Sequence, residues 1–138
     1  MGQILAIDYG KARCGIAATD DMQIIASGLD TVQTSSVIGF LKKYFSENRV
    51  DEVVIGLPVD LKGNVSEVEK DILKFIDIFE KEFPAVKVYR FDERFTSKMA
   101  SFFISQSGKS KKQRQEKGLI DKVSATIILQ NFLEQKTR

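Results

Sequence analysis

The hydrophobic pattern of the chain changes period near residue 33, and that change restricts the folds it can adopt. Residues 3–8 and 13–19 are two short apolar runs joined by the turn "DYGKA", and a third run covers residues 23–32 after the polar turn "TDD". Runs of this length with short connections are typical of antiparallel strands. The start of the chain therefore predicts a three-stranded meander.

Beyond the meander, helical and extended patterns alternate. Apolar residues recur at helical spacing in "TSSVIGFLKKYFSEN" and again over 68–83, where Ser66 and Glu69 fit a capping box. The elements expected in this part are a helix over 34–48, a strand over 53–57 ended by Pro58, a helix over 66–83 stopped by Pro84, a strand within 86–95, a helix over 96–106 and a last helix over roughly 121–135.

This order of elements predicts one fold class. Antiparallel strands followed by strands that alternate with helices imply an α/β fold, a mixed five-stranded sheet with three antiparallel and then parallel strands, and helices on both faces. That description fits the ribonuclease H-like architecture. A Rossmann domain fits poorly, because the first turn lacks GxGxxG and leads to a strand. The length of 138 residues is typical of one domain, expected to span 1–138.

The composition excludes several kinds of chemistry. There is no histidine, which removes Ser-His-Asp triads, Cys-His pairs and histidine-ligated metals. The single cysteine, Cys14, cannot form an intramolecular disulfide and is expected to be a small buried hydrophobe. No apolar run is long enough for a membrane span and no signal pattern opens the chain, so we expect a cytoplasmic protein without membrane contact.

Asp8 stands where the first apolar run ends, followed by Gly10 and by two basic residues, Lys11 and Arg13. A "DxG" hairpin after a first strand wraps a phosphate in actin-like ATPases, whereas the aspartate at the same strand end of ribonuclease H-like nucleases binds a divalent metal. An Asx-turn aspartate is the structural alternative. The ATPase arrangement needs two domains, and this chain has room for one.

Two further acidic positions follow apolar segments. Asp92 and Glu93 lie where a strand gives way to a helix, an edge at which open α/β sheets bind ligands. The structural alternative is a helix start, because acids favour the first helical turn. Adjacent strand residues point to opposite faces, and alternation does not say which of the two acids would face a site. Asp121 falls on the same helical face as Ala125 and Ile128, unless it is simply an N-cap. Carboxylates converging from distant segments suit Mg²⁺ or Mn²⁺ and phosphodiester cleavage.

A basic segment over 107–118 contains few apolar residues and has glycine near both ends, which predicts a mobile loop. We expect it to contact a phosphate backbone, with a solvated linker as the alternative. Its basic residues are Lys109, Lys111, Lys112, Arg114 and Lys117.

Four ordered segments, "DYGKARCGIA", "VVIGLP" with a glycine at 63, "DERFTS" and "KGLIDKVSATIILQNFL", resemble the bacterial YqgF family along nearly the whole chain. That family is described as putative pre-16S rRNA nucleases or Holliday junction resolvase-like proteins. The resemblance implies a ribonuclease H-like, Mg²⁺- or Mn²⁺-dependent nuclease whose catalytic and metal-binding acids are Asp8, Glu93 and Asp121. The choice of Glu93 over Asp92 rests on the resemblance alone.

The remaining expectations concern the substrate. Lys11, Arg13 and Arg94 are candidate phosphate contacts, although Arg94 could instead pair with a neighbouring acid. The chain departs from the family at Ala12, where a basic residue is usual. Related resolvases carry an acid where this chain has "IGLP", so the number of bound metal ions, one or two, stays open. Gly56 and Pro58 either shape a rigid loop beside the site or form a simple turn.

The implied reaction is processing of the 5′ end of precursor 16S rRNA, by a monomer or a homodimer. The alternatives are a Holliday junction resolvase acting on branched DNA, which would need a dimer, and a non-catalytic nucleic-acid-binding module that requires no metal.

Overall fold

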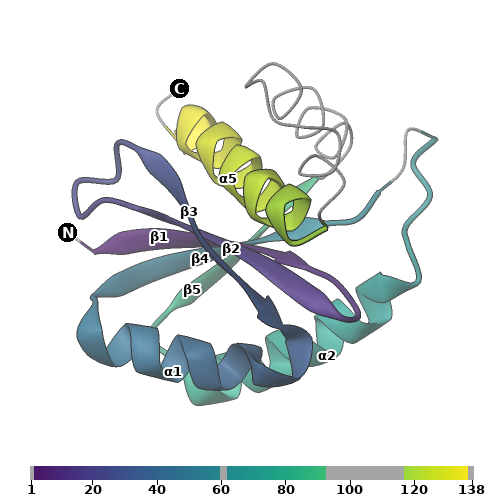
Figure 1. Ribbon diagram of the computed structural model, residues 1–138, viewed down its shortest axis with the longest axis horizontal. Helices are drawn as coiled ribbons and strands as arrows, with labels where there is room; N and C mark the ends of the chain where they lie inside the picture. Colours follow the sequence, from purple (N-terminus) through teal and green to yellow (C-terminus); the bar gives the residue numbers. More distant parts are fainter. Residues whose placement is uncertain (1, 60–61, 93–116, 137–138) are drawn as a thin grey trace.

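The computed structural model describes residues 2–59, 62–92 and 117–136, except for the side chains of 117–121. Within these residues, five strands form one sheet in the order β3-β2-β1-β4-β5 (Figure 1). The strands are β1 (Gln3–Tyr9), β2 (Arg13–Thr19), β3 (Ala26–Gln33), β4 (Val50–Leu57) and β5 (Lys87–Asp92). The helices within the described residues are η1 (Thr34–Ser36), α1 (Val37–Glu47), α2 (Val68–Glu82) and α5 (Lys117–Lys136).

The directions of the strands confirm the predicted mixed sheet. β1 runs antiparallel to β2, and β2 antiparallel to β3, which is the expected meander. β4 then pairs with β1 in parallel, and β5 with β4 in parallel. Because parallel strands start at the same edge, the carboxyl ends of β1, β4 and β5 lie together at the opposite edge.

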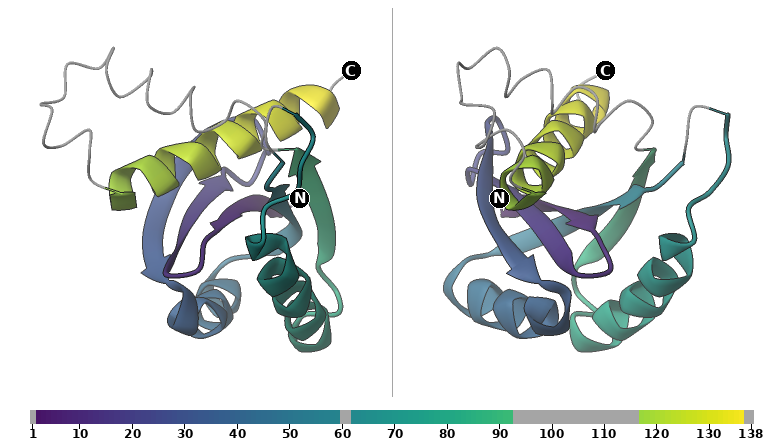
Figure 2. Two further views of the ribbon diagram at one scale, coloured as in Figure 1. Left: turned by 90° about the vertical axis from the view of Figure 1, so that its right-hand side faces the viewer. Right: turned by 45° about the vertical axis from the view of Figure 1, so that its right-hand side comes forward.

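Helices cover both faces of the sheet. Figure 2 shows α5 against one face and α1 with α2 against the other. Alternate residues of β1 serve the two layers: Leu5 and Ile7 belong to the core under α1 and α2, and Ile4 and Ala6 to the core under α5. These four side chains have no exposed surface, so the strand is buried on both sides, as a strand in the middle of an α/β sheet should be.

The predicted apolar stripes of the helices are confirmed. On α2, Ile72, Phe75 and Phe79 are buried, and the partly buried members of the stripe pack against them. On α5, the stripe predicted from the sequence is buried against the sheet: Ala125, Ile128, Leu129, Phe132 and Leu133. Cys14 is buried, as expected.

The start of α5 was predicted wrongly. The helix begins at Lys117, several residues before the expected 121, so residues 117–118 are helical and do not belong to a loop. Gly118 suggested a loop, but a glycine in a helix costs only about 1 kcal/mol, which burial of the long apolar stripe outweighs. The rest of the expected basic loop, and the helix expected over 96–106, lie outside the described residues.

The third strand also begins later than predicted. Gln23 has a positive φ of 58°, a turn conformation that a strand cannot contain. The carboxylate of Asp20 accepts hydrogen bonds from the backbone N–H groups of Ile24 and Ile25, both at 2.8 Å, which fixes this turn. These hydrogen bonds hold the pKa of Asp20 below its usual value. Ile24 and Ile25 resembled strand residues, but they are exposed on the turn.

The predicted capping box is absent. The Ser66 hydroxyl does accept from the N–H of Val68 at 3.4 Å, but the Ser66 N–H donates to the carbonyl of Pro58 at 2.8 Å instead of to Glu69. Glu69 binds Arg90 of β5, with two N···O distances of 2.8 and 2.6 Å. A bidentate guanidinium is a stronger partner for a carboxylate than one backbone N–H, so the contact across the fold replaces the local one.

Candidate functional site

Asp8, the member of the predicted acid set whose side chain the structure describes, lies at the edge of the sheet where β1, β4 and β5 end. The parallel pairing aligns Ile7 with Ile55 and Leu57 with Asp92, so the last residues of the three strands are at similar heights. Loops and helix starts meet at such an edge, which is where open α/β sheets bind ligands.

Asp8 is half-buried and lies on the α5 face of this edge. It follows the alternation of Ile4 and Ala6, which pack under α5, and its neighbour across the sheet is Gly15 of β2. Tyr9, the next residue, belongs to the core on the other face. The strand end therefore presents a carboxylate to one side and an aromatic ring to the other.

The turn after Asp8 is held rigidly. A Cβ atom on Gly10 would lie 2.6 Å from the carbonyl oxygen of Arg13, closer than real Cβ atoms come, so only glycine fits. Thr34 fastens the turn from η1, because its hydroxyl donates to the carbonyl of Gly10 at 2.7 Å and its N–H to that of Ala12 at 3.0 Å. Asp8 thus stands at a fixed position. Nothing in the sequence pattern pointed to Thr34.

Asp92, one of the two acids between which the sequence pattern left the choice open, lies on the other face. It follows the alternation of Val88 and Arg90, which contact the core and the helix on the α2 side. Phe91, in contrast, packs on the α5 face. Asp92 and Asp8 therefore do not face the same side of the sheet. Glu93, two residues after Phe91, lies outside the described residues.

The start of α5 lies over the same side of the sheet as Asp8. A Cβ atom on Gly28 of β3 would come within 2.8 Å of the Cγ atom of Lys122, so the helix runs close above the sheet there. Gly28 pairs with Ala17, and Ala17 with Ala6, two residues before Asp8. Asp121 precedes Lys122 in α5, one helical turn before the buried Ala125. The structure does not describe its side chain.

The predicted cationic residues are only partly described. Lys11 is exposed in the turn and Arg13 is half-buried at the start of β2. Lys117 opens α5, and its side chain is not described. Arg94, Lys109, Lys111, Lys112 and Arg114 lie outside the described residues.

The end of β4 is tied to β5 and α2 by contacts that sequence reasoning missed. Arg90 donates from Nε to the carbonyl of Ile55 at 3.2 Å and from Nη2 to that of Gly56 at 3.1 Å, besides binding Glu69. Val59 and Val65 form an isolated bridge beyond Pro58. One guanidinium therefore links β5, the end of β4 and the first turn of α2.

Within 2–59, 62–92 and 122–136, no group of three or more acidic or cysteine side chains is close enough to hold a metal ion. Two of the three predicted acids have undescribed side chains, so this finding does not test the predicted set. No helix in the described part of the chain is long and apolar enough to cross a membrane.

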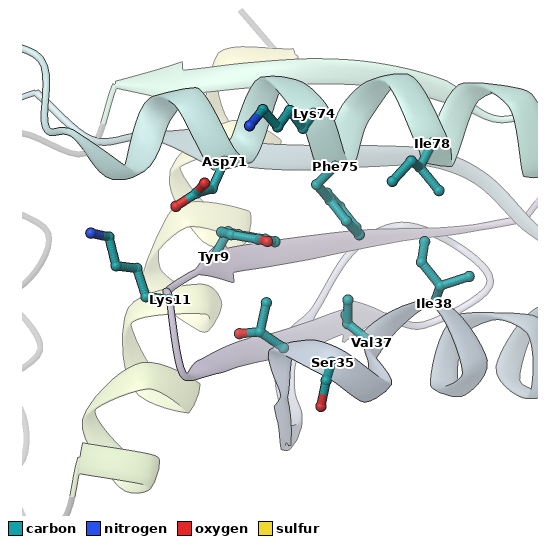
Figure 3. Close-up of a pocket in the computed structure, with 10 residues that line it drawn as sticks. Tyr9, Lys11, Ser35, Val37, Ile38, Asp71, Lys74, Phe75 and Ile78 are labelled. Atoms are coloured by element: carbon teal, nitrogen blue, oxygen red, sulfur yellow. The ribbon is translucent and has the colours of Figure 1, made fainter.

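A groove that the sequence did not predict opens between α1 and α2, on the face of the sheet opposite Asp8 and α5 (Figure 3). It begins at Tyr9, whose ring centroid is 5.1 Å from that of Phe75. Burial, with Cys14 and Asp71 nearby, raises the pKa of Tyr9 above its usual value, so its hydroxyl stays protonated. The residues that line the groove come from four separate elements and from the turn after β1, so no local pattern could have shown it.

Solved structures with the same fold are Holliday junction resolvases. RuvC of T. thermophilus in complex with a Holliday junction substrate matches with a TM-score of 0.60 at 14% identity, over 99% of this chain and 96% of that one. The fowlpox virus Holliday junction resolvase matches with a TM-score of 0.53 at 16% identity, over 96% and 99%. The fold class is thus ribonuclease H-like, as predicted.

The particular family is shown by sequence. The profile of the RuvX family, described as "Holliday junction resolvase", matches residues 2–135, and the chain belongs to this family. A relative from Flavobacterium johnsoniae is 55% identical over 136 residues, and one from Bacteroides fragilis 46% identical over 136 residues, each covering 99% of both chains. Both carry the name "Putative pre-16S rRNA nuclease". The family resemblance found in the motifs is confirmed.

Proposed function

We propose that this protein is a cytoplasmic, metal-dependent nuclease that hydrolyses phosphodiester bonds in structured nucleic acid, and that it processes the 5′ end of precursor 16S rRNA. One nuclease domain over 1–138 carries the activity. The observation that supports this most is the position of Asp8, a half-buried carboxylate near the end of β1, beside a fixed turn, that faces the side where α5 starts. The names of the relatives supply the substrate.

The proposed metal ligands are Asp8, Glu93 and Asp121. The donor set fits Mg²⁺ or Mn²⁺, because these cations prefer carboxylate oxygens, and acids gathered without a cation would repel one another. The geometry of β5 supports Glu93 rather than Asp92, since Asp92 lies on the opposite face from Asp8. A bound divalent cation would supply the positive charge that stabilises negative charge in the transition state.

The chain's own residues position the substrate. Lys11 and Arg13 follow Asp8 closely along the chain, so a strand whose phosphates they bind would pass close to the carboxylate. The turn itself does not adjust, because Thr34 and Gly10 fix it. Arg94 and the basic residues of 107–117 are proposed to bind the phosphates on either side, which contributes affinity without sequence preference.

The test is cleavage of end-labelled precursor 16S rRNA by the Asp8→Asn variant in the presence of Mn²⁺. We expect a loss of at least about a hundredfold in rate, the scale of removing one group that stabilises a transition state. Asp77→Asn is the matched control, because Asp77 is an exposed carboxylate on α2 that pairs with Lys81 of the same helix. Unchanged cleavage by Asp8→Asn would contradict the proposal, and metal-independent binding without cleavage would favour a non-catalytic module.

The second candidate function is resolution of Holliday junctions, which the description of the family profile and the resolvase structures favour. A resolvase that cuts two strands symmetrically needs a dimer. Cleavage of a four-way DNA junction is therefore compared with cleavage of the precursor RNA, and the mass in solution is measured alongside. Junction cleavage by a dimer, with intact RNA, would favour the resolvase.

A further inference from the structure

The groove between α1 and α2 has the size and the lining of a ligand site. Its volume is about 520 Å³, within the range of small-molecule sites. It is lined by Tyr9, Lys11, Thr34, Ser35, Val37, Ile38, Asp71, Lys74, Phe75 and Ile78. Figure 3 shows Lys11 and Asp71 toward one end and Ile38 and Ile78 toward the other.

The apolar part of the groove suits a flat ring. Tyr9 and Phe75 meet at 41° with their ring centroids 5.1 Å apart; both line the groove, but Phe75 is only 5% exposed, so Tyr9 is the ring that a ligand can reach. Ile78 completes this part and keeps 52% of its surface exposed. An apolar side chain left in solvent beside a partly exposed aromatic ring offers surface that a planar ligand could cover.

The charged part of the groove suits an anion that also carries hydrogen-bond donors. Lys11 and Lys74 supply two positive charges, and neither takes part in an ion pair within the described part of the chain. Asp71 adds one carboxylate, close enough to Tyr9 to contribute to its raised pKa. A nucleotide has this combination of groups: a phosphate for the lysines, and a base with ring faces and amino groups.

The groove is adjacent to the proposed cleavage site. Tyr9 directly follows Asp8, and consecutive Cα atoms are about 3.8 Å apart, although the two side chains face opposite sides of the sheet. A strand that crosses this edge with one phosphate near Asp8 can therefore place a neighbouring nucleotide on the α1–α2 side.

We propose that the groove binds an unpaired nucleotide of the substrate strand, with its base against Tyr9 and Ile78 and its phosphate beside Lys11 and Lys74. This inference rests on the proposed nuclease function and names a subsite for it. Stacking of an unpaired base on aromatic side chains next to cations is how single-stranded nucleic acid is commonly bound. The site would select substrates with a single-stranded segment beside the cut.

The test uses an RNA hairpin with a short single-stranded 5′ tail that carries 2-aminopurine at one tail position at a time. Binding is measured without divalent metal, so that no cleavage occurs. We expect one tail position to show quenched fluorescence on binding, because contact with aromatic rings quenches this base. Ile78→Glu should abolish that quenching and weaken affinity by about tenfold, within the range for one base–aromatic contact.

The matched control is Leu73→Glu. Leu73 is on the same helix, is 55% exposed and does not line the groove. The variant therefore introduces the same charge at a similarly exposed position outside the groove. It should bind and quench like the wild type. A second variant, Lys74→Glu, changes an exposed residue and cannot disturb the core, yet it should weaken binding as Ile78→Glu does.

The outcomes separate the two proposals, because cleavage with Mn²⁺ is measured independently. If the wild type cleaves RNA while Ile78→Glu and Lys74→Glu bind and quench as the wild type does, the groove proposal is refuted and the nuclease stands. If the wild type binds with position-specific quenching that these variants lose, but never cleaves, the groove stands and the nuclease fails. A wild type that does not bind the RNA refutes both.

Discussion

The ion pair between Arg90 and Glu69 should matter far more to stability than the other pairs on the same helix. Its side chains are only 25% and 15% exposed, and the guanidinium also donates to the carbonyls of Ile55 and Gly56. Changing Glu69 to Gln would leave a half-buried cation with fewer partners. Breaking a buried pair costs about 3–5 kcal/mol, and partial exposure reduces this to about 2 kcal/mol.

The comparison on the same helix is the pair of Lys81 with Asp77, whose side chains are 78% and 69% exposed. Asp77→Asn should lower the free energy of unfolding by at most about 0.5 kcal/mol, as expected for an exposed i,i+4 pair. Both variants are unfolded with urea. Their free energies of unfolding are compared provided that the dependence on urea concentration, the m-value, is the same for both.

A third variant tests whether the isolated charge causes the loss. The double variant Glu69→Leu with Arg90→Met removes the buried charge as well as the ion pair. It should therefore lose less free energy of unfolding than the sum of the losses in Glu69→Leu alone and Arg90→Met alone. The reasoning is refuted if Glu69→Gln is as stable as Asp77→Asn, or if the two single losses simply add. An intact fold with slower cleavage in Glu69→Gln would further show that this link positions the edge near Asp8.

Three further changes test the turns at the two ends of β2. Gly10→Ala should destabilise the fold by about 1–3 kcal/mol and reduce cleavage, because the added Cβ would lie 2.6 Å from the carbonyl oxygen of Arg13. A variant as stable in urea as the wild type would show that the turn can relax. Thr34→Val should cost about 1 kcal/mol by removing the hydroxyl that donates to Gly10, and an unchanged melting temperature would contradict the role given to it. Asp20 has a lowered pKa in the folded protein, so its contribution to stability is present above the pKa of the unfolded chain and is lost as the pH falls through the folded pKa. Asp20→Asn should therefore flatten the acid side of the stability-against-pH curve, and a curve parallel to that of the wild type would argue against this.

The sheet could be predicted because its information is local. Short apolar runs bounded by turns, and helical stripes such as the one from Ala125 to Leu133, identify their elements without reference to the rest of the chain. The errors occurred where a distant or conformational effect dominated. Glu69 matched a local capping pattern but binds Arg90, and Ile24 and Ile25 matched a strand but are held in a turn by Asp20.

The site could be predicted only in part, for the same reason. The acid at the end of β1 is visible in the sequence. Alternation along β5 indicates that Asp92 and the residue after it face opposite sides of the sheet, but it does not tell which of the two faces the same side as Asp8. That assignment required the packing of Val88 and Phe91 on opposite faces, which places Asp92 away from Asp8. The groove was not predictable, because its lining from β1, η1, α1 and α2 comes together only in the folded chain.

The central claim is that Asp8, Glu93 and Asp121 hold a divalent cation. Calorimetric titration of Mn²⁺ into the wild type, with substrate analogue RNA present and absent, tests it most directly. The wild type should bind the metal, Asp8→Asn, Glu93→Gln and Asp121→Asn should each bind it at least about tenfold more weakly, and Asp77→Asn should bind it like the wild type. Equal Mn²⁺ binding by the wild type and Asp8→Asn, or no metal binding by the wild type even with RNA, would contradict the claim.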